Sequence, residues 1–375
     1  MNKKILEEKT EKVVNRLLHL GDADYESDKN TNSREIGRGL IARDFGIEEW
    51  DWPQGVGLYG LCKLQELKGN TYYDEFLNHW FTHNIEKGLP SKNINTTAPY
   101  LALLDYARRT NNESYKSMCL AHAEWLMKDL PRTAEGGFQH VTSAIGDRNG
   151  VELHKGQLWP DTLFMAVLFL CRSGHYFHRP DFIEESIHQF LIHIKYLWDK
   201  GTCLFHHGWT FQDRNNFGNI FWCRGNSWFT IGVMEFIESF RETPLPKSTL
   251  SYLLNTYIAQ VQSLLSLQEK NGLWHTILDD PSSYCEVSGS AAIAAGILKG
   301  IRLGVLENSC LDAARRAIHG ICNNISDDGT VLQVSAGTGI GMTPEHYKNI
   351  LIRPMAYGQS LTLLALTEIS RIDYM

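Results

Sequence analysis

Residues 97–129 read TAPYLALLDYARRTNNESYKSMCLAHAEWLMKD and carry the pattern that decides the fold. Apolar side chains recur at spacings of three and four residues on both sides of the polar stretch Arg109-Thr110-Asn111-Asn112. This spacing places apolar side chains on one face of a helix, and the two Asn residues interrupt it. The stretch therefore predicts two helices joined by a short turn.

The same pattern covers most of the chain and predicts an all-α protein. The expected helices cover roughly residues 4–20, 55–68, 71–86, 97–110, 113–129, 161–174, 181–198, 226–241, 248–269, 287–304, 308–323 and 354–371. Helix pairs follow one another at uneven intervals of roughly 45 to 70 residues, which argues against a short-repeat solenoid. Six helical hairpins closed into a ring suit the length. No linker interrupts the pattern, so residues 1–375 are expected to form a single domain.

Composition excludes several classes of protein. A chain of 375 residues with 43% hydrophobic and 21% charged residues buries a large core. Its net charge of −7 argues against nucleic acid or an anionic membrane as a partner. No apolar run has membrane-spanning length, and the first residues lack the apolar core of a signal peptide, so a cytoplasmic protein is expected. The oligomeric state stays open.

The eight cysteines lie far apart and form no CxxC pair. This spacing predicts neither a disulfide framework nor a compact zinc site. The cysteines are expected to be reduced and mostly buried.

Long loops rich in aromatic residues alternate with short polar ones. Seven of the ten tryptophans fall in or beside the long loops: Trp50, Trp52, Trp159, Trp209, Trp222, Trp228 and Trp274. A sugar ring offers an apolar face for stacking and hydroxyls for hydrogen bonds, so aromatic side chains beside polar ones favour a carbohydrate site. The alternative is that the tryptophans only cap the ring of helices.

Asp161 is the candidate acid, because it follows Trp159-Pro160 and directly precedes an apolar helix. Apolar neighbours raise the pKa of a carboxyl group, as a proton donor near neutral pH requires. The alternative role is that of a helix N-cap. The residues alone do not separate the two.

Other polar residues in the loops are candidates for binding a sugar or its carboxylate. His207 is suited to bind a hydroxyl or carboxylate, and Arg224 and Arg353 are suited to a bidentate grip on a carboxylate. A structural histidine and ordinary helix-end ion pairs are the alternatives. The stretch Ser335-Ala336-Gly337-Thr338-Gly339-Ile340-Gly341 lacks the lysine of a phosphate-binding loop, and its glycine pattern is interpreted as coincidental.

Six strings in this order resemble glycoside hydrolase family 105, which contains the unsaturated rhamnogalacturonyl hydrolases. They are Trp52-Pro53-Gln54-Gly55-Val56-Gly57-Leu58-Tyr59-Gly60, Gly136-Gly137-Phe138-Gln139-His140, Leu158-Trp159-Pro160-Asp161-Thr162-Leu163-Phe164-Met165-Ala166, His207-Gly208-Trp209, Trp222-Cys223-Arg224-Gly225-Asn226-Ser227-Trp228 and Tyr284-Cys285-Glu286-Val287-Ser288-Gly289-Ser290-Ala291. The likeness runs from about residue 50 to Arg353.

The resemblance implies an (α/α)6 barrel with Asp161 as general acid and base. It also implies contacts with the sugar from His140, Trp159, His207, Trp222, Arg224 and Trp228. Many relatives carry Asp where this chain has Asn95, so a second acidic partner is replaced by an amide.

The implied reaction removes a terminal 4,5-unsaturated uronic acid from an oligosaccharide that a lyase has made. The acid protonates C4, and water then adds at C5, so one carboxyl group serves both steps and no metal or organic cofactor is required. Three rivals stay open: a hydrolase of unsaturated glucuronyl units from glycosaminoglycan fragments, a sugar 2-epimerase with a histidine pair, and a non-enzymatic helical scaffold.

Overall fold

The computed structural model describes residues 3–20, 46–144 and 147–373. It is mostly helical, as the apolar spacing predicts, and two sets of helices differ in burial. The first set is enclosed over most of its surface and consists of α4 (Trp52–Lys68), α6 (Ile94–Thr110), the π-helical turn η2 (Leu163–Val167) with α8 (Leu168–Tyr176), α10 (Cys223–Glu238), α12 (Val287–Arg302) and α15 (Ala356–Asp373).

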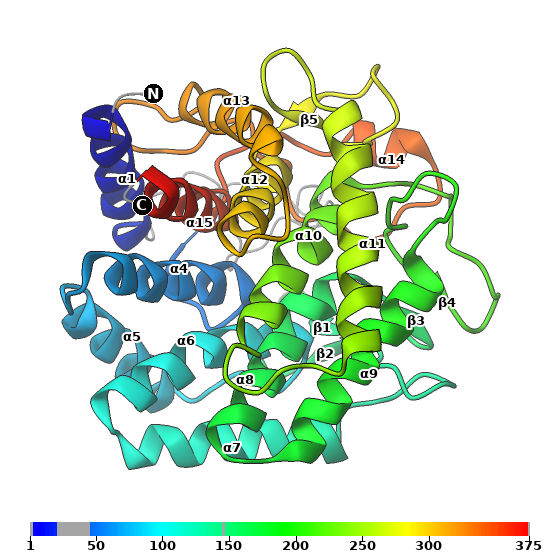
Figure 1. Ribbon diagram of the computed structural model, residues 1–375. Helices are drawn as coiled ribbons and strands as arrows, with labels where there is room; N and C mark the ends of the chain where they lie inside the picture. The colour runs from blue at the N-terminus through cyan, green and yellow to red at the C-terminus, as the bar shows by residue number, and fades with distance from the viewer. Residues whose placement is uncertain (1–2, 21–45, 145–146, 374–375) are drawn as a thin grey trace.

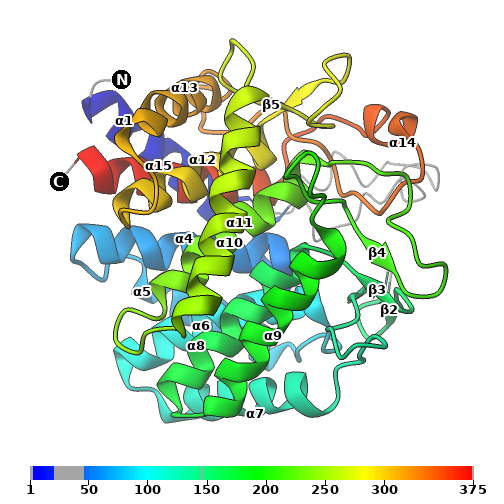
Figure 2. The ribbon, with the colours of Figure 1, turned by 45° about the vertical axis from the view of Figure 1, so that its right-hand side comes forward.

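The second set buries one face only and packs outside the first. It consists of α1 (Lys3–Leu18), α5 (Asp74–Glu86), α7 (Glu113–Lys128), α9 (Pro180–Leu197), α11 (Lys247–Ser266) and α13 (Leu311–Cys322). One-sided burial is what an amphipathic surface helix shows. The helices α1 and α15 pack together and lie side by side in Figures 1 and 2.

The inner helices are neighbours of one another in a regular order. Helix α4 packs against α6 and α15, helix α12 against α10 and α15, and η2 with α8 lies between α6 and α10. Glycines permit the closest approaches. A Cβ at Gly55 of α4 would lie 2.5 Å from the backbone of Pro99 in α6, and one at Gly296 of α12 would lie 2.6 Å from the backbone of Thr230 in α10.

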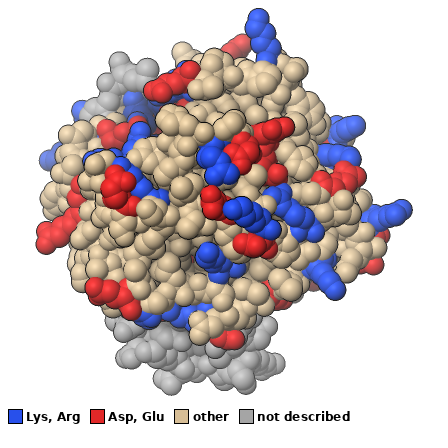
Figure 3. Space-filling model, turned by 90° about the horizontal axis from the view of Figure 1, so that it is seen from below, with Lys and Arg blue, Asp and Glu red and all other residues tan. Residues whose placement is uncertain are grey.

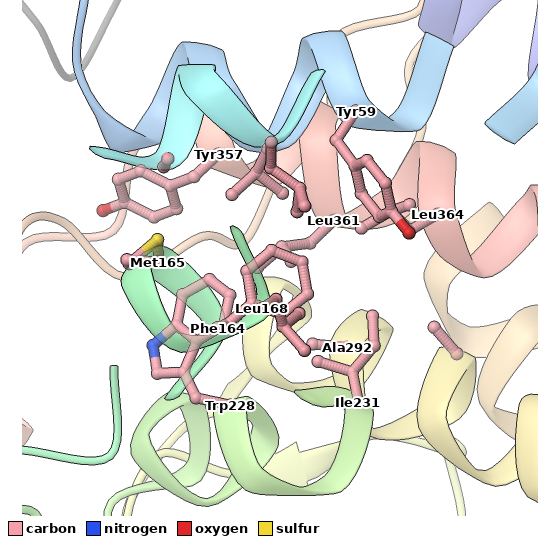
Figure 4. Close-up of a cluster of buried hydrophobic side chains, with 14 of the residues drawn as sticks. Tyr59, Phe164, Met165, Leu168, Trp228, Ile231, Ala292, Tyr357, Leu361 and Leu364 are labelled. Atoms are coloured by element: carbon pink, nitrogen blue, oxygen red, sulfur yellow. The ribbon is translucent and has the colours of Figure 1, made fainter. Parts of the chain in front are cut away.

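The core lies where these inner helices meet. Figure 4 shows side chains from five of them in one cluster of buried residues: Tyr59 from α4, Phe164, Met165 and Leu168 from η2 and α8, Trp228 and Ile231 from α10, Ala292 from α12, and Tyr357, Leu361 and Leu364 from α15. All ten are fully or almost fully buried. The inner helices are therefore held by apolar packing on several faces at once.

Charged residues are distributed in two different ways. On the face in Figure 3, Lys and Arg side chains are interspersed with Asp and Glu side chains. Inside the molecule, Lys299 of α12 is fully buried and forms ion pairs with Glu235 and Glu238 of α10 and Glu368 of α15. This buried network joins three inner helices by charge as well as by apolar contacts.

The strands are short, and they were not expected from the sequence because two or three residues show no periodicity. They form three antiparallel pairs: β1 (Val141–Ser143) with β2 (Val151–Leu153), β3 (Gln157–Leu158) with β4 (Trp209–Thr210), and β5 (Trp274–His275) with β6 (Cys285–Glu286). A short 3-10 turn, η3 (Asn308–Cys310), precedes α13. The short helix α14 (Pro344–Lys348) follows α13 in the chain. Helix α14, β3 and β4 lie along the right-hand side in Figures 1 and 2.

All eight cysteines carry free thiols, and five of them are buried, as the spacing predicts. Among the described residues, no helix is both long and apolar enough to cross a membrane.

Candidate active site

A cavity of about 1010 Å³ opens where the inner helices begin. Trp52 starts α4, Asn95 lies in the first turn of α6, and Trp222 is the N-cap of α10. Asp161 stands two residues before η2, next to the N-cap residue Thr162. The residues that line the cavity are Trp52, Asn95, His140, Thr142, Glu152, His154, Trp159, Asp161, Trp222, Arg224, Gly337, Thr338, Gly339, Thr343, Glu345, His346, Asn349, Ile350 and Leu351.

Two capped helix starts hold Trp52 and Asn95 in place. Asp51 caps α4 by accepting a hydrogen bond of 2.7 Å from the backbone N–H of Trp52. Asn93 caps α6 in a reciprocal capping box with the N3 residue of that helix. The Ser143 hydroxyl donates to Asp51 and accepts from the Asn93 amide, at 2.7 and 3.1 Å, so one residue of β1 ties the two caps together.

Asp161 is an acid that lines the cavity. Its surroundings raise the pKa of the carboxyl group to about 6, because burial disfavours the charged form and the positive charge of Arg224 offsets this only in part. The Asp161 Oδ2 atom is buried and makes no hydrogen bond within the described residues. The next two backbone N–H groups donate to the carbonyls of Trp159 and Pro160 and not to the carboxylate.

Aromatic and imidazole rings form a continuous wall beside Asp161. His140 stacks on Trp159 with ring centroids 4.2 Å apart and an angle of 8°. His140 Nδ1 lies 3.1 Å from the hydroxyl of Thr162, and His154 stands 4.6 Å from the Trp159 ring. Burial lowers the pKa of His140 well below its ordinary value, so this ring is neutral and offers hydrogen bonds without charge.

His207 and Trp228 lie directly behind the lining residues. The His207 ring is 4.1 Å from Trp222 and 5.3 Å from Trp159, measured between centroids, and the ring is buried. Trp228 is fully buried and packs edge-on against Trp52 at 5.7 Å. Both residues support the wall, and the Trp228 indole also helps to hold down the pKa of Asp161.

Arg224 is a buried cation at the edge of the cavity. Its Nη1 atom donates to the Ser288 hydroxyl and to both oxygens of Ser335, and its Nη2 atom donates to the Ala336 carbonyl and the Thr338 hydroxyl, over 2.7 to 3.1 Å. Among the described residues it forms no ion pair. The positive charge is therefore available to the cavity, while the terminal nitrogens already hold the loop that begins at Ser335.

Arg353 is placed differently from the other predicted residues. It is not among the residues that line the cavity, and its backbone N–H donates to the carbonyl of Val334 at 2.9 Å. The residue is half-buried.

Sequence reasoning missed one wall of the cavity. This wall is the segment from Ser335 to Leu351, which contains α14 and contributes nine of the lining residues. From the sequence, only its residues 335–341 are interpreted, as a coincidental glycine pattern. The useful signal was its length between two helices, together with the adjacent ring residues His346 and Tyr347. Thr142, Glu152 and His154 of the β1 and β2 hairpin were missed as well.

The cavity combines positive charge with flat aromatic surfaces, which suits an anionic sugar. Several helices begin at it, and helix N-termini carry partial positive charge. Arg224 adds a full charge, and flat rings of Trp52, Trp159 and Trp222 offer stacking surfaces. A carboxyl group with a pKa near 6 is suited to donate a proton near neutral pH.

A mostly helical fold around an aromatic cavity that carries an acid fits a glycoside hydrolase. The chain belongs to Glycosyl Hydrolase Family 88, whose family model matches residues 38–373. It is 32% identical to the unsaturated rhamnogalacturonyl hydrolase YesR of Bacillus subtilis, over 88% of this chain and 92% of that protein.

Solved structures show the same relationship. A possible member of family 105 from Salmonella enterica is 36% identical and superposes with a TM-score of 0.89, covering 100% of this chain and 96% of that one. The resemblance to family 105 that the sequence strings predict is thus confirmed. The unsaturated glucuronyl hydrolase of Bacillus sp. GL1, at 18% identity, covers 96% of this chain and 97% of its own with a TM-score of 0.69, and shares the fold.

Proposed function

We propose that this glycoside hydrolase removes a terminal 4,5-unsaturated uronic acid from short oligosaccharides produced by a polysaccharide lyase. The observation that carries the proposal is the raised pKa of Asp161 in an aromatic cavity. The buried cation that lines the same cavity is Arg224. Ordinary glycoside hydrolysis uses two carboxylates on either side of the bond. Here Asn95 stands in the first turn of α6, where a second acid is expected from the resemblance.

The substrate class follows from the charges and from the relatives. The unsaturated uronic acid carries a carboxylate, which Arg224 and the converging helix starts attract. YesR acts, by its name, on unsaturated rhamnogalacturonyl units, and its likeness extends over nearly the whole chain. A rhamnogalacturonan-type fragment is therefore the preferred substrate. Glycosaminoglycan-type fragments are the alternative, which a panel of disaccharides tests.

The chemistry uses the enol ether of the unsaturated ring. Asp161 donates its proton to C4, the C4=C5 π electrons form the new C–H bond, and positive charge develops at C5, shared with the ring oxygen. Water adds at C5 while the Asp161 carboxylate takes its proton, which restores the acid. The resulting hemiketal opens, and the bond to the remaining sugar breaks as the released oligosaccharide gains a proton.

The remaining predicted residues are assigned binding roles. Trp52, Trp159 and Trp222 stack on sugar faces, His140 and His207 bind oxygens of the sugar, and the Asn95 amide binds without adding a second negative charge. Trp228 supports Trp52 and Asp161 from behind. Arg353 remains a predicted contact for the substrate carboxylate.

The proposal extends to architecture and compartment. The neighbour relations of the inner helices, each backed by an outer helix, support an (α/α)6 barrel closed into a ring. One core cluster spans residues from α1 to α15, which supports a single domain over residues 1–375. Eight free thiols without a disulfide suit the reducing cytoplasm.

The decisive experiment follows the ultraviolet absorbance of an unsaturated disaccharide. The conjugated C4=C5 bond absorbs, and hydration removes the chromophore, so added protein is expected to abolish the signal. An epimerase or a binding scaffold leaves it unchanged. Turnover in ¹⁸O-water is expected to place the label at C5 of the released keto-uronate, whereas label at C1 would contradict the hydration route.

A further inference from the structure

The segment from Ser335 to Leu351 reaches the cavity through a buried phenol that the proposed chemistry does not use. Tyr347 of α14 is fully buried, and its hydroxyl oxygen lies 2.6 Å from His207 Nδ1. The backbone N–H of Gly341 donates to the same oxygen at 3.1 Å. In the described part of the chain, these are the groups within hydrogen-bond distance of the phenol.

The donors and acceptors in this triad fix where each hydrogen lies. The Gly341 N–H is only a donor, so it leaves the phenol hydrogen in need of an acceptor. His207 Nδ1 is the partner that is able to accept it. A neutral imidazole carries its hydrogen on one nitrogen, so accepting at Nδ1 places the hydrogen of His207 on Nε2.

The His207 ring packs directly behind the cavity wall, and its second nitrogen, Nε2, is left without a partner there in the part of the chain that the structure describes. Nε2 is buried and makes no hydrogen bond within the described residues. The ring lies against Trp159 and Trp222, which both line the cavity. Asp161 Oδ2 and the indole nitrogen of Trp222 are likewise buried without a hydrogen bond among those residues. A bound sugar supplies oxygens that pair with such groups.

Helix α14 is anchored so that the phenol keeps its position. The Tyr284 hydroxyl donates to the backbone carbonyl of Tyr347 at 3.2 Å, and Lys348 pairs with Asp280 at 2.6 Å. Tyr347 also packs in a small buried cluster with Ile220, Trp222 and Ile277. The phenol is thus held from its backbone and from its ring.

We propose that Tyr347 is a positioning residue that holds His207 in the Nε2–H form, so that His207 presents a fixed donor to an oxygen of the sugar beside Asp161. The identity of the sugar rests on the proposed function. The hydrogen-bonding state of His207 does not, because it is a property of the free protein.

The first test is nuclear magnetic resonance of the full chain labelled with ¹⁵N-histidine. Two-bond ¹H–¹⁵N correlations distinguish Nε2–H from Nδ1–H, and His207→Gln assigns the signal. Wild type is expected to show His207 as Nε2–H, and Tyr347→Phe is expected to lose that single form. Tyr257→Phe is the matched control, because it also removes one buried phenol hydroxyl, bonded to the Gly296 carbonyl at 2.8 Å. An Nδ1–H signal in wild type, or an unchanged Nε2–H signal in Tyr347→Phe, would overturn the proposal.

The second test keeps Tyr347 intact and so does not depend on the folding of its variant. In His207→Gln the side-chain amide reaches the position of Nε2, whereas in His207→Asn it reaches only that of Nδ1. His207→Gln is expected to retain about tenfold more kcat/KM on an unsaturated disaccharide, the size expected for one hydrogen bond. Equal losses would overturn the sugar contact. Wild-type protein that leaves every unsaturated disaccharide intact would instead overturn the proposed function, and the resonance result would decide on Tyr347.

Discussion

Nη1 of Arg224 donates to both the carbonyl and the hydroxyl oxygens of Ser335, at 3.0 and 2.7 Å, across 111 residues of sequence. The same guanidinium lies 4.5 Å from the Trp222 ring centroid and 4.7 Å from that of Tyr357. The cation therefore joins the start of α10 to the loop that forms the far wall of the cavity. We infer that its charge attracts the substrate carboxylate, whereas its hydrogen bonds hold the loop that begins at Ser335. Substitutions of Arg224 are able to separate these two roles.

Replacing Arg224 tests the charge. Arg224→Leu removes it, so preference for the unsaturated acid over its methyl ester is expected to fall, because the ester carries no charge to attract. Arg224→Lys keeps the charge but loses the branched set of donors to Ser335, Ala336 and Thr338, so preference for the acid is expected to persist at reduced activity. The ratio of kcat/KM for acid and ester measures this. An unchanged ratio in Arg224→Leu removes Arg224 from carboxylate recognition.

The raised pKa of Asp161 predicts the pH dependence of activity. The reaction begins with the protonated carboxyl group, and its pKa of about 6 means that this form is lost as the pH rises above that value. We expect kcat/KM to fall about tenfold for each pH unit on the alkaline side. Rates measured from pH 4 to 9 with an unsaturated disaccharide check this. A flat profile through pH 8 would assign the proton donor elsewhere.

Asn95 offers a way to move that pH profile. Asn95 and Asp161 line the same cavity, and Asn95→Asp adds a carboxylate there. A nearby like charge disfavours ionisation, so the pKa of Asp161 is expected to rise and the alkaline limb of activity to move to higher pH. Asn349→Asp is the matched control, because Asn349 also lines the cavity but is exposed, where water screens its charge. Equal shifts in the two variants would argue against a local effect at Asn95.

The sequence predicts those parts of the fold and of the site that depend on neighbouring residues in the chain. The helices followed from apolar spacing, and Asp161 stood out because Trp159-Pro160 precedes an apolar helix. Trp50 and Trp274 also suggested a site, yet both are buried with indole N–H groups donating to the carbonyls of Thr96 and Leu264. A tryptophan beside a loop does not reveal which way its ring points.

The wall from Ser335 to Leu351 lay beyond prediction for a different reason. Its partners are set by tertiary contacts such as Arg224 with Ser335 and His207 with Tyr347, which span 111 and 140 residues. Neither periodicity nor local propensity carries that information. The π-helical turn after Asp161 was equally hidden, because its sequence LFMAV has no feature that separates it from an α-helix.

The buried ion pairs predict a large loss of stability. Lys299→Met leaves the buried Glu235 without its α12 partner, so the free energy of unfolding is expected to fall by roughly 3 to 5 kcal/mol. Lys195→Met is the matched control, because its pair with Glu135 is exposed to water and is expected to contribute little to stability. Denaturant titration measures both, and similar small losses would contradict the assigned role of the network.

The last prediction concerns Asp161→Asn, which separates catalysis from stability at one position. Asparagine keeps the size of the side chain but has no proton to donate, so turnover is expected to fall by roughly 10² to 10⁴-fold while substrate binding persists.

Because the pKa of Asp161 is raised to about 6 in the folded protein, the folded state prefers the neutral carboxyl group, and wild-type stability declines as the pH rises from about 4 to above 6. The variant is neutral at every pH. It is therefore expected to match wild type near pH 4 and to exceed it at pH 8, by at most about 3 kcal/mol. Melting curves at the two pH values, together with single-turnover rates, check both parts. Near-normal turnover by the folded variant would refute the catalytic role, and a variant less stable than wild type at pH 8 would refute the burial of an uncompensated charge.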